Sequence, residues 1–291
     1  MTVSLIHTIQ ELRSRLYLRR HRGAVIGLVP TMGSLHAGHG RLMEMARQEC
    51  NNLVVSIFVN PIQFNRPDDY ERYPRTIETD LRFCEERGVD VVFAPRVEEI
   101  YPEPVLTFVE VERVAEHLCG KFRPGHFRGV ATVVAKLLNI VQPDRAYFGE
   151  KDAQQLAVIR RMVRDLNLPV EIVPAPTVRE PDGLALSSRN QHLNPEERRA
   201  APVLYQALSE ARRTIEDGAT DPEHVKQAAS AVLAQESLVR IEYLEVVDPE
   251  EMQPVDRIDG PVRVAVAAWL GTTRLIDNVE AGRIPAEPRL G

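Results

Sequence analysis

The sequence predicts an α/β protein, with a doubly wound parallel sheet followed by a second, smaller α+β domain at the C-terminus. Up to about residue 175, continuous apolar runs alternate with segments of helical periodicity. This is the pattern of parallel strands covered by helices on both faces. At 174–190 the alternation gives way to PAPTVREPDGLALSSRN, which is rich in Pro, Gly and Ser. We therefore place a domain boundary there and expect domains 1–180 and 181–291.

The elements of the first domain follow from hydrophobic periodicity. An N-terminal amphipathic helix, without the apolar region of a signal peptide, is predicted by residues at helical intervals: Ile6, Ile9, Leu12 and Leu16. Continuous apolar runs predict five strands, at 24–29, 53–59, 89–94, 145–148 and 170–173. The helical segments between these strands lie at 39–50, 76–87, 130–141 and 153–166.

The second domain begins with a strong helix start. Asn194 is a suitable N-cap, Pro195 stands at the first helical position, and two glutamates fill the first turn. This start predicts a helix over 195–216. A further helix is expected at 222–235, and strands are expected at IEYLEVV (241–247) and VRVAVAAW (262–269).

Composition excludes several classes of protein. The chain has 291 residues, 44% hydrophobic and 27% charged, as in an ordinary globular protein, and no run approaches the roughly 18 apolar residues of a membrane span. A net charge of −6 disfavours a broad basic surface for nucleic acid. Cys50, Cys84 and Cys119 form no CxxC pair, so we expect reduced packing residues. We expect a cytoplasmic enzyme that binds neither nucleic acid nor membrane.

Glycine and polar residues directly follow three of the predicted strands. PTMGSLHAGH follows the first, NPIQF the second and GEKDAQQ the fourth. In a doubly wound sheet, ligands bind beyond the carboxyl ends of the strands. We therefore expect these three strand ends to converge on one crevice.

Two histidines, His36 and His39, stand three residues apart near a predicted helix start. This spacing puts both imidazoles on one face, beside the N–H groups and partial positive charge of the helix N-terminus. Imidazoles can stabilise growing charge on phosphate oxygens, and Gly33 and Gly38 allow close backbone approach to a nucleotide. The motif alone fits equally well a turn with solvated or capping histidines. A zinc site is weaker, because no third ligand stands at metal spacing.

Two further stretches carry groups that suit phosphates. Lys151 follows a predicted strand and supplies a point charge, and the loop Leu186–Arg189 supplies two hydroxyls and a guanidinium. Each has a structural alternative, since Asp152 with Gln155 fits a helix cap and Ser-Ser-Arg fits an ordinary turn. Together with the histidine pair, the two stretches suggest binding and transfer of a nucleotidyl group.

Amide and guanidinium groups suit a substrate that carries hydroxyl and carboxylate groups. Gln63 and Gln155 can each donate and accept, although Gln63 can equally tie down its own loop. Arg123 lies in the loop RPGHFRG, which fits an anion site or a solvated basic turn. Asp80 is our candidate metal ligand, with a solvated helical acid as the alternative.

Together these residues resemble the pantoate–β-alanine ligase (pantothenate synthetase) family, within the HxGH nucleotidylyltransferases. The family's motifs occur in order from about Val25 to Asn278: PTMGSLHAGH, VVSIFVNPIQF, YPRT, RPGHFRGVATVVAKL, FGEKDAQQL, DGLALSSRN and VAAWLGTTRLIDN. The resemblance implies a Rossmann-like catalytic domain closed by a small C-terminal domain, usually in a homodimer. It implies that pantoate attacks ATP, with Mg²⁺, to give pantoyl adenylate and pyrophosphate, and that β-alanine then displaces AMP to give pantothenate.

The resemblance also implies site residues. ATP would be bound by Met32, Gly33, Ser34, Leu35, His36, Ala37, Gly38, His39, Gly149, Glu150, Lys151, Asp152, Val178, Leu186, Ser187, Ser188 and Arg189. Catalysis would use the groups at the phosphates: His36, His39, Lys151, Ser187, Ser188 and Arg189, with His39 the candidate proton donor. Asp152 would lie near the ribose and Val178 at the adenine. Gln63 and Gln155 would hold pantoate, with Arg123 as a further substrate contact.

Two other functions stay open at this point. Another small nucleotidylyltransferase would share HxGH but would not need the paired glutamines. A non-catalytic nucleotide sensor on the same fold would bind ATP without releasing pyrophosphate. A tRNA-dependent enzyme is disfavoured, because the chain is short and acidic.

Overall fold

The structure is a computed structural model that describes residues 3–65 and 67–282. Its contacts divide the chain into two compact units. The first comprises Met1–Glu112, Phe122–Glu150 and Val158–Val178, and the second comprises Arg113–Lys121, Lys151–Ala157 and Arg179–Gly291. The second unit thus includes two early segments that a boundary at residue 180 does not anticipate, and the expected division at that residue stays a prediction. Residues 283–291 of the predicted C-terminal domain lie outside the described residues.

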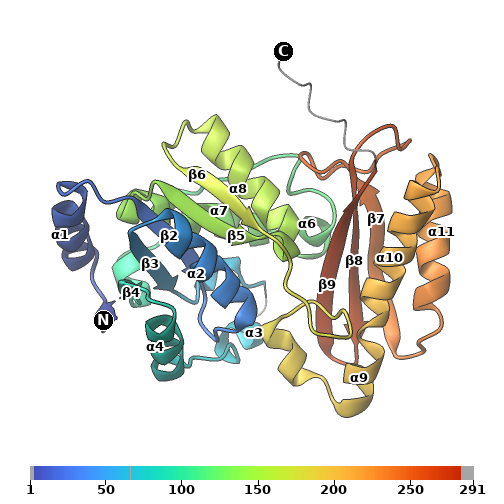
Figure 1. The fold of residues 1–291 in the computed structure, drawn as a ribbon, viewed down its shortest axis with the longest axis horizontal. Helices are drawn as coiled ribbons and strands as arrows, with labels where there is room; N and C mark the ends of the chain where they lie inside the picture. Colours follow the sequence, from blue (N-terminus) through green and yellow to red (C-terminus); the bar gives the residue numbers. More distant parts are fainter. Residues whose placement is uncertain (1–2, 66, 283–291) are drawn as a thin grey trace. The chain divides into compact units, whose positions relative to one another are not determined.

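A six-stranded parallel sheet forms the centre of the first unit, in the order β1-β4-β3-β2-β5-β6 (Figure 1). The strands are β1 (Ser4–Ile6), β2 (Ile26–Thr31), β3 (Asn52–Ile57), β4 (Val91–Phe93), β5 (Arg145–Gly149) and β6 (Glu171–Ala175). From β2 the chain continues to β3 and β4 on one side of the sheet, and it later returns to β5 and β6 on the other side. The topological switch point of the sheet therefore lies between β2 and β5. The predicted doubly wound fold is confirmed.

Helices cover both faces of this sheet (Figure 1). Helix α2 (Ala37–Glu49) packs on β2 and β5, and α7 (His126–Val141) contacts β2 and α1 (Ile9–Arg20). The other helices of this part of the chain are α3 (Pro67–Glu71), α4 (Ile77–Glu86), α5 (Val97–Ile100), α6 (Cys119–Phe122) and α8 (Ala153–Asp165). The apolar side of α2 buries Leu42, Met43 and Ala46 against strand residues such as Val29 and Val55, which keeps the start of α2 at the carboxyl end of β2.

The N-terminal helix prediction is wrong at its first residue. Ile6 is buried in strand β1, where it pairs with Phe93 of β4, and the helix begins only at Ile9. Thr8 caps this helix by accepting a hydrogen bond from the Glu11 N–H. Pairing with a strand far along the chain outweighs the local helical spacing of Ile6.

The second unit contains a three-stranded antiparallel sheet of β7 (Val239–Val247), β8 (Val262–Leu270) and β9 (Thr273–Ala281). Helices α10 (Val203–Glu216) and α11 (Pro222–Leu233) pack on it. The single helix expected over 195–216 is wrong, because α9 (Pro195–Ala200) ends before Pro202 and α10 starts after it. Strand β9 was not predicted. The predicted N-cap is confirmed, since the Asn194 side chain accepts from the N–H groups of Glu196 and Glu197.

The cysteine prediction is confirmed, because Cys50, Cys84 and Cys119 are all free and buried. Burial raises the pKa of the Cys50 thiol and raises that of Cys84 to about 12, which keeps both protonated.

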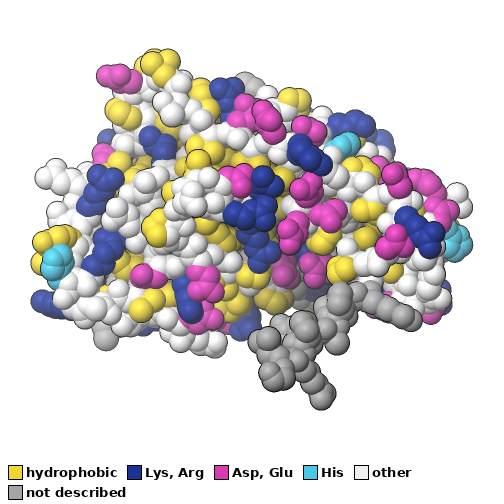
Figure 2. All heavy atoms as spheres, turned by 90° about the horizontal axis from the view of Figure 1, so that it is seen from above, with side chains coloured by type: hydrophobic (Ala, Val, Ile, Leu, Met, Phe, Trp, Pro, Cys, Tyr) yellow, Lys and Arg dark blue, Asp and Glu magenta, His cyan; other side chains and the backbone are white. Residues whose placement is uncertain are grey.

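On the face seen in Figure 2, basic and acidic side chains are interspersed. Among the described residues, no helix is long and apolar enough to cross a membrane.

Candidate active site

The segment after β2 makes a left-handed turn at the switch point of the sheet. Gly33 has φ +82° and Ser34 has φ +52°, a region that side chains rarely adopt. A Cβ at Gly33 would also lie 3.0 Å from a carboxylate oxygen of Asp80. The glycine is therefore needed here, and Ser34 is held in a strained conformation by the surrounding structure.

Asp80 of α4 holds this loop in place. It is 1% exposed, and its two carboxylate oxygens accept hydrogen bonds from the N–H groups of Ser34 (3.0 Å) and Leu35 (2.8 Å). The hydroxyl of Thr76 donates to it as well, at 3.1 Å. The alternative of a solvated helical acid is therefore wrong. Asp80 orients the backbone that leads into the histidine motif.

The described residues contain no group of three or more His, Cys, Asp or Glu side chains placed to hold a metal ion. Asp80, our candidate ligand, already accepts three hydrogen bonds with its two oxygens. Its observed partners thus account for its burial without a metal.

The two histidines cap the helix that they begin. Helix α2 starts at Ala37, and Nδ1 of the N-cap His36 accepts from the Gly38 N–H at 3.1 Å. Nδ1 of His39 accepts in turn from the His36 N–H at 3.3 Å. The rings lie on one side of the helix start, with centroids 4.1 Å apart. The capping alternative is thus correct for Nδ1.

Capping and phosphate binding are compatible in these rings, because they use different nitrogens. A nitrogen that accepts a backbone N–H carries no proton, so the proton of each neutral ring lies on Nε2. The cap therefore fixes both His36 and His39 as Nε2–H donors. Two oriented donors at a helix N-terminus form a site that can stabilise charge on phosphate oxygens.

Gln63 joins the loop after β3 to the loop after β2. It lies in the short 3₁₀ turn Pro61–Gln63, is 8% exposed, and its amide nitrogen donates to the sulfur of Met32 at 3.0 Å. Its amide oxygen accepts from Asn60 at 3.0 Å, and Asn60 also accepts from the Tyr101 hydroxyl. Two residues predicted for different ligands, Met32 and Gln63, are therefore in contact.

Arg123 reaches the same turn through a histidine. The Nδ1–H of His126 donates to the backbone carbonyl of Gln63 at 2.8 Å, so Nε2 of that ring is the acceptor for the Arg123 guanidinium at 3.2 Å. His126 is buried, at 9% exposed. Sequence reasoning missed this residue, although it stands within the motif RPGHF.

We predict that Gly129→Ala disturbs this turn. A Cβ at Gly129 of α7 would lie 2.5 Å from the Ile62 carbonyl oxygen and 2.7 Å from Cα of Gln63. Overpacking of this kind costs about 1–3 kcal/mol, and thermal unfolding should detect it together with a raised KM for the ligand of Gln63. Gly260→Ala is the matched control, because its Cβ would meet nothing within 4 Å. Equal melting temperatures for the two variants would contradict the tight contact.

The second unit contains the other residues that the sequence predicts for phosphate binding. Lys151, Ser187 and Arg189 line one small cavity in this unit, together with Asn190, Arg274 and Asp277. Ser187 caps the 3₁₀ turn Ser188–His192 by accepting from the Arg189 N–H at 3.3 Å. The turn alternative is thus correct for Ser-Ser-Arg, and the turn still presents cationic and hydroxyl groups beside Lys151.

The other residues predicted to bind ATP or pantoate lie around β5, at the start of α8 and in the segment after β6. Gly149 ends β5, and Glu150, Lys151 and Asp152 form a 3₁₀ turn that leads into α8. Of the two neighbouring glutamines, Gln154 is buried and donates to the carbonyls of Val114 and His117 at 2.9 and 2.7 Å, whereas Gln155 is half-buried. Val178 and Leu186 are half-buried.

Comparison with known proteins assigns the family. The model of the family described as pantoate-beta-alanine ligase matches residues 4–280. Pantothenate synthetase of Thermotoga petrophila is 53% identical over 280 residues, which is 96% of this chain and 100% of the relative. The enzyme of Thermotoga neapolitana is 54% identical over 278 residues, covering 96% and 99%.

The chain belongs to the pantoate–β-alanine ligase family. Among solved structures, the pantothenate synthetase of Thermus thermophilus superposes on this ligase with a TM-score of 0.90 at 48% identity, covering 97% of this chain and 100% of that one. The ligase of Francisella tularensis, solved in complex with β-γ ATP and β-alanine, gives a TM-score of 0.78 at 35% identity and covers 95% and 97%. The family predicted from the motifs is confirmed.

Sequence reasoning did not single out Arg274 and Asp277 of this ligase, which lie close to the predicted residue Lys151. Both line the cavity of Lys151, and both lie on β9. The signal was present in GTTRLIDN, where charged residues interrupt an apolar run. Buried charges in a strand require partners, and those partners come from distant segments.

Proposed function

We propose that this ligase joins pantoate and β-alanine to form pantothenate through a pantoyl adenylate, at the expense of ATP. Family membership over residues 4–280 makes the chain an ATP-dependent pantoate–β-alanine ligase. The observation that carries the chemical route is the pair His36 and His39, held as Nε2–H donors at the start of α2. Such donors suit chemistry at phosphorus.

In the first step, a carboxylate oxygen of pantoate attacks the α-phosphorus of ATP. The bond from that phosphorus to the bridging oxygen breaks, and pyrophosphate leaves with the bond electrons. His36 and His39 stabilise the charge that grows on the phosphate oxygens by donating hydrogen bonds from Nε2, so His39 acts as a hydrogen-bond donor and pyrophosphate leaves without taking its proton. No protein nucleophile is required, because the protein mainly positions groups and stabilises charge in phosphoryl chemistry.

We assign the polyphosphate to the cationic and hydroxyl groups of the second unit. Lys151 supplies a point charge, and the Ser188–His192 turn supplies the guanidinium of Arg189 beside the hydroxyls of Ser187 and Ser188. The remainder of ATP is assigned to the residues predicted from the motifs: Met32, Gly33, Ser34, Leu35, Ala37, Gly38, Gly149, Glu150, Asp152, Val178 and Leu186.

In the second step, the amine of β-alanine attacks the acyl carbon of pantoyl adenylate. A C–N bond forms, the bond from the acyl carbon to the phosphate oxygen breaks, and AMP leaves while the amine loses a proton. Gln63 and Gln155 hold the hydroxyl and carbonyl groups of the pantoyl part. Arg123 acts on this side of the site through His126 and the Gln63 carbonyl.

Mg²⁺ accompanies ATP in this proposal. Since the described residues offer no group of three or more acidic, histidine or cysteine ligands, the ion would be held mainly by phosphate oxygens and water. It would neutralise charge on the polyphosphate. We also propose that the ligase acts as a homodimer in the cytoplasm, and that neither nucleic acid nor a membrane is its partner.

ATP–pyrophosphate exchange tests the first step directly. The assay contains ATP, Mg²⁺ and D-pantoate but no β-alanine, and other hydroxy acids serve as controls. Exchange that depends on pantoate is expected, because the adenylate then forms reversibly. ATP binding without exchange would contradict the adenylate route and favour a nucleotide sensor. Exchange supported equally by other acids would favour another nucleotidylyltransferase.

A further inference from the structure

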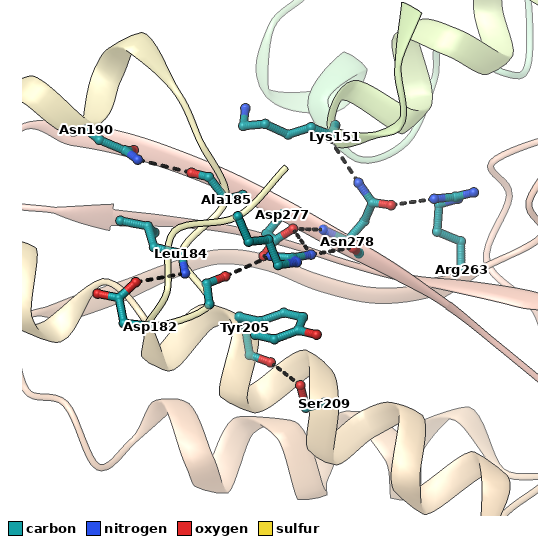
Figure 3. A network of polar contacts seen from close by, with 12 residues as sticks. Lys151, Asp182, Leu184, Ala185, Asn190, Tyr205, Ser209, Arg263, Asp277 and Asn278 are labelled. Atoms are coloured by element: carbon teal, nitrogen blue, oxygen red, sulfur yellow. Dashed lines mark hydrogen bonds and ion pairs between the residues drawn. The ribbon is translucent and has the colours of Figure 1, made fainter. Parts of the chain in front are cut away.

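Two neighbouring side chains of β9, Asp277 and Asn278, are buried in the second unit at 5% and 6% exposed. Adjacent residues of a strand point to opposite faces of the sheet. Figure 3 shows Asn278 joined to the backbone of Lys151, whereas the contacts of Asp277 lead through Arg179 to the ring of Tyr205. One strand therefore presents two buried polar groups in opposite directions, and neither group has a part in the reaction described above.

Asn278 holds the backbone at Lys151. Its amide nitrogen donates to the Lys151 carbonyl at 3.0 Å (Figure 3). Its amide oxygen accepts from the guanidinium of Arg263, which also pairs with Glu280. Because a guanidinium only donates, this contact fixes which end of the amide carries the oxygen. The amide N–H is thereby directed at the carbonyl of Lys151.

Asp277 holds the segment that precedes the Ser-Ser-Arg turn. Its carboxylate accepts two hydrogen bonds from the guanidinium of Arg179, at 2.6 and 3.0 Å. Arg179 also donates to the Gly183 carbonyl at 3.0 Å and lies 3.8 Å from the ring centroid of Tyr205. An isolated bridge pairs Arg179 with Ala185, just before the turn. The ion pair thus fixes the loop that carries Ser187 and Arg189.

We propose that Asp277 and Asn278 are positioning residues for the polyphosphate contacts of this ligase. Asn278 fixes the root of Lys151, and Asp277 fixes the base of the loop that carries Ser187. Lysine has a flexible four-carbon stem, so its ammonium is placed only as well as its backbone is held. Because both anchors stand side by side on β9, the lysine and the loop keep a constant spacing. The inference rests on the proposed contact of Lys151 with phosphate.

Asn278→Asp tests this role with little change of shape. A carboxylate still accepts from Arg263, but it has no N–H for the Lys151 carbonyl. We expect kcat/KM for ATP in pantoate-dependent pyrophosphate exchange to fall roughly 10-fold to 100-fold, the range for a small misplacement of a positioned group. Formation of pantothenate from prepared pantoyl adenylate and β-alanine should stay nearly unchanged, because that step does not use the polyphosphate.

Glu280→Gln is the matched control. Glu280 lies two residues further on the same strand, and its side chain contacts Arg263 from there. We expect exchange to be unchanged in this variant. If Asn278→Asp does not fold, Asn278→Ser serves in its place, since it also removes the amide N–H. A loss of both half-reactions in a folded variant would overturn the proposal in favour of a general structural role.

A double-mutant cycle with Lys151→Ala distinguishes a failure of the positioning role of Asn278 from a failure of the proposed phosphate contact of Lys151. If Asn278 acts through Lys151, adding Asn278→Asp to Lys151→Ala should cause little further loss of exchange. Losses that multiply would overturn the positioning role and leave the proposed function intact. Normal exchange in Lys151→Ala alone would overturn the phosphate role of the lysine, and the positioning role would fail with it.

Discussion

Replacing His39 by alanine is expected to lower the rate of pantoate-dependent adenylation by roughly 10² or more, the effect of losing a transition-state donor. ATP affinity should change much less, because the donor acts most strongly on charge that grows during the reaction. Pre-steady-state measurement of pyrophosphate release, with ATP binding measured separately, checks both expectations.

His39 also has a structural role, since its Nδ1 accepts from the His36 N–H at 3.3 Å. Two conservative variants separate this role from the donor. In His39→Asn, the amide oxygen can replace Nδ1 as acceptor, while nothing replaces the Nε2–H. In His39→Gln, the amide nitrogen can replace Nε2 as donor. We therefore expect Asn to be as slow as Ala and Gln to retain part of the rate.

The opposite order would mean that the cap, and not the donor, sets the rate. His21→Ala is the control for loss of an imidazole, because His21 is an exposed residue after α1 whose Nδ1 bonds the Tyr17 carbonyl. Its rate should match that of the unaltered ligase. A loss of ATP affinity in His39→Ala as large as its loss of rate would indicate a histidine that only binds.

Local patterns were enough to predict most of the parallel sheet. Five of its six strands coincide with apolar runs that can be recognised from their own residues. The sixth, β1, has three residues and exists through its pairing with β4. The strand β9 was missed for a related reason. Its buried Asp277 and Asn278 contradict the expected apolar pattern, and Arg179 and Arg263 satisfy them from elsewhere in the chain.

The same division applies to the site. The histidine motif is local, so its place at a helix start could be predicted from the glycines and the preceding strand. The Ser-Ser-Arg loop was likewise found from its composition. The partner of the loop after β2 could not be found in this way, because Asp80 stands 45 residues beyond Leu35 and looks like an exposed acid on a helix. Its burial depends on how α4 packs.

Replacing Asp80 by asparagine is expected to be nearly as damaging as the loss of His39. The N–H groups of Ser34 and Leu35 each donate to a different carboxylate oxygen of Asp80. In asparagine an amide nitrogen replaces one of these oxygens, and it cannot accept the hydrogen bond. Hydrogen bonds to a charged group contribute about 1.5–3 kcal/mol each, so the loop should lose its left-handed turn. We expect kcat/KM for ATP to fall on the order of 10²-fold, measured by pyrophosphate exchange.

Asp90→Asn is the matched control for the cost in stability. Asp90 also accepts a backbone hydrogen bond, from Leu53 at 2.8 Å, and pairs with Arg47 at 2.7 Å, but it stands at the beginning of β4. Since ligands bind at the carboxyl ends of such strands, this variant should lower the melting temperature without raising the KM for ATP. Equal kinetic losses in both variants would contradict a specific role of Asp80 in the loop.

The dependence on Mg²⁺ then distinguishes positioning from metal binding at Asp80. A carboxylate that ligates the ion would make Asp80→Asn need more Mg²⁺, so that high concentrations restore exchange. A carboxylate that holds backbone N–H groups predicts a loss that no concentration of Mg²⁺ restores, because the defect lies in the loop. We expect the second result, since both oxygens of Asp80 are already engaged with Ser34, Leu35 and Thr76.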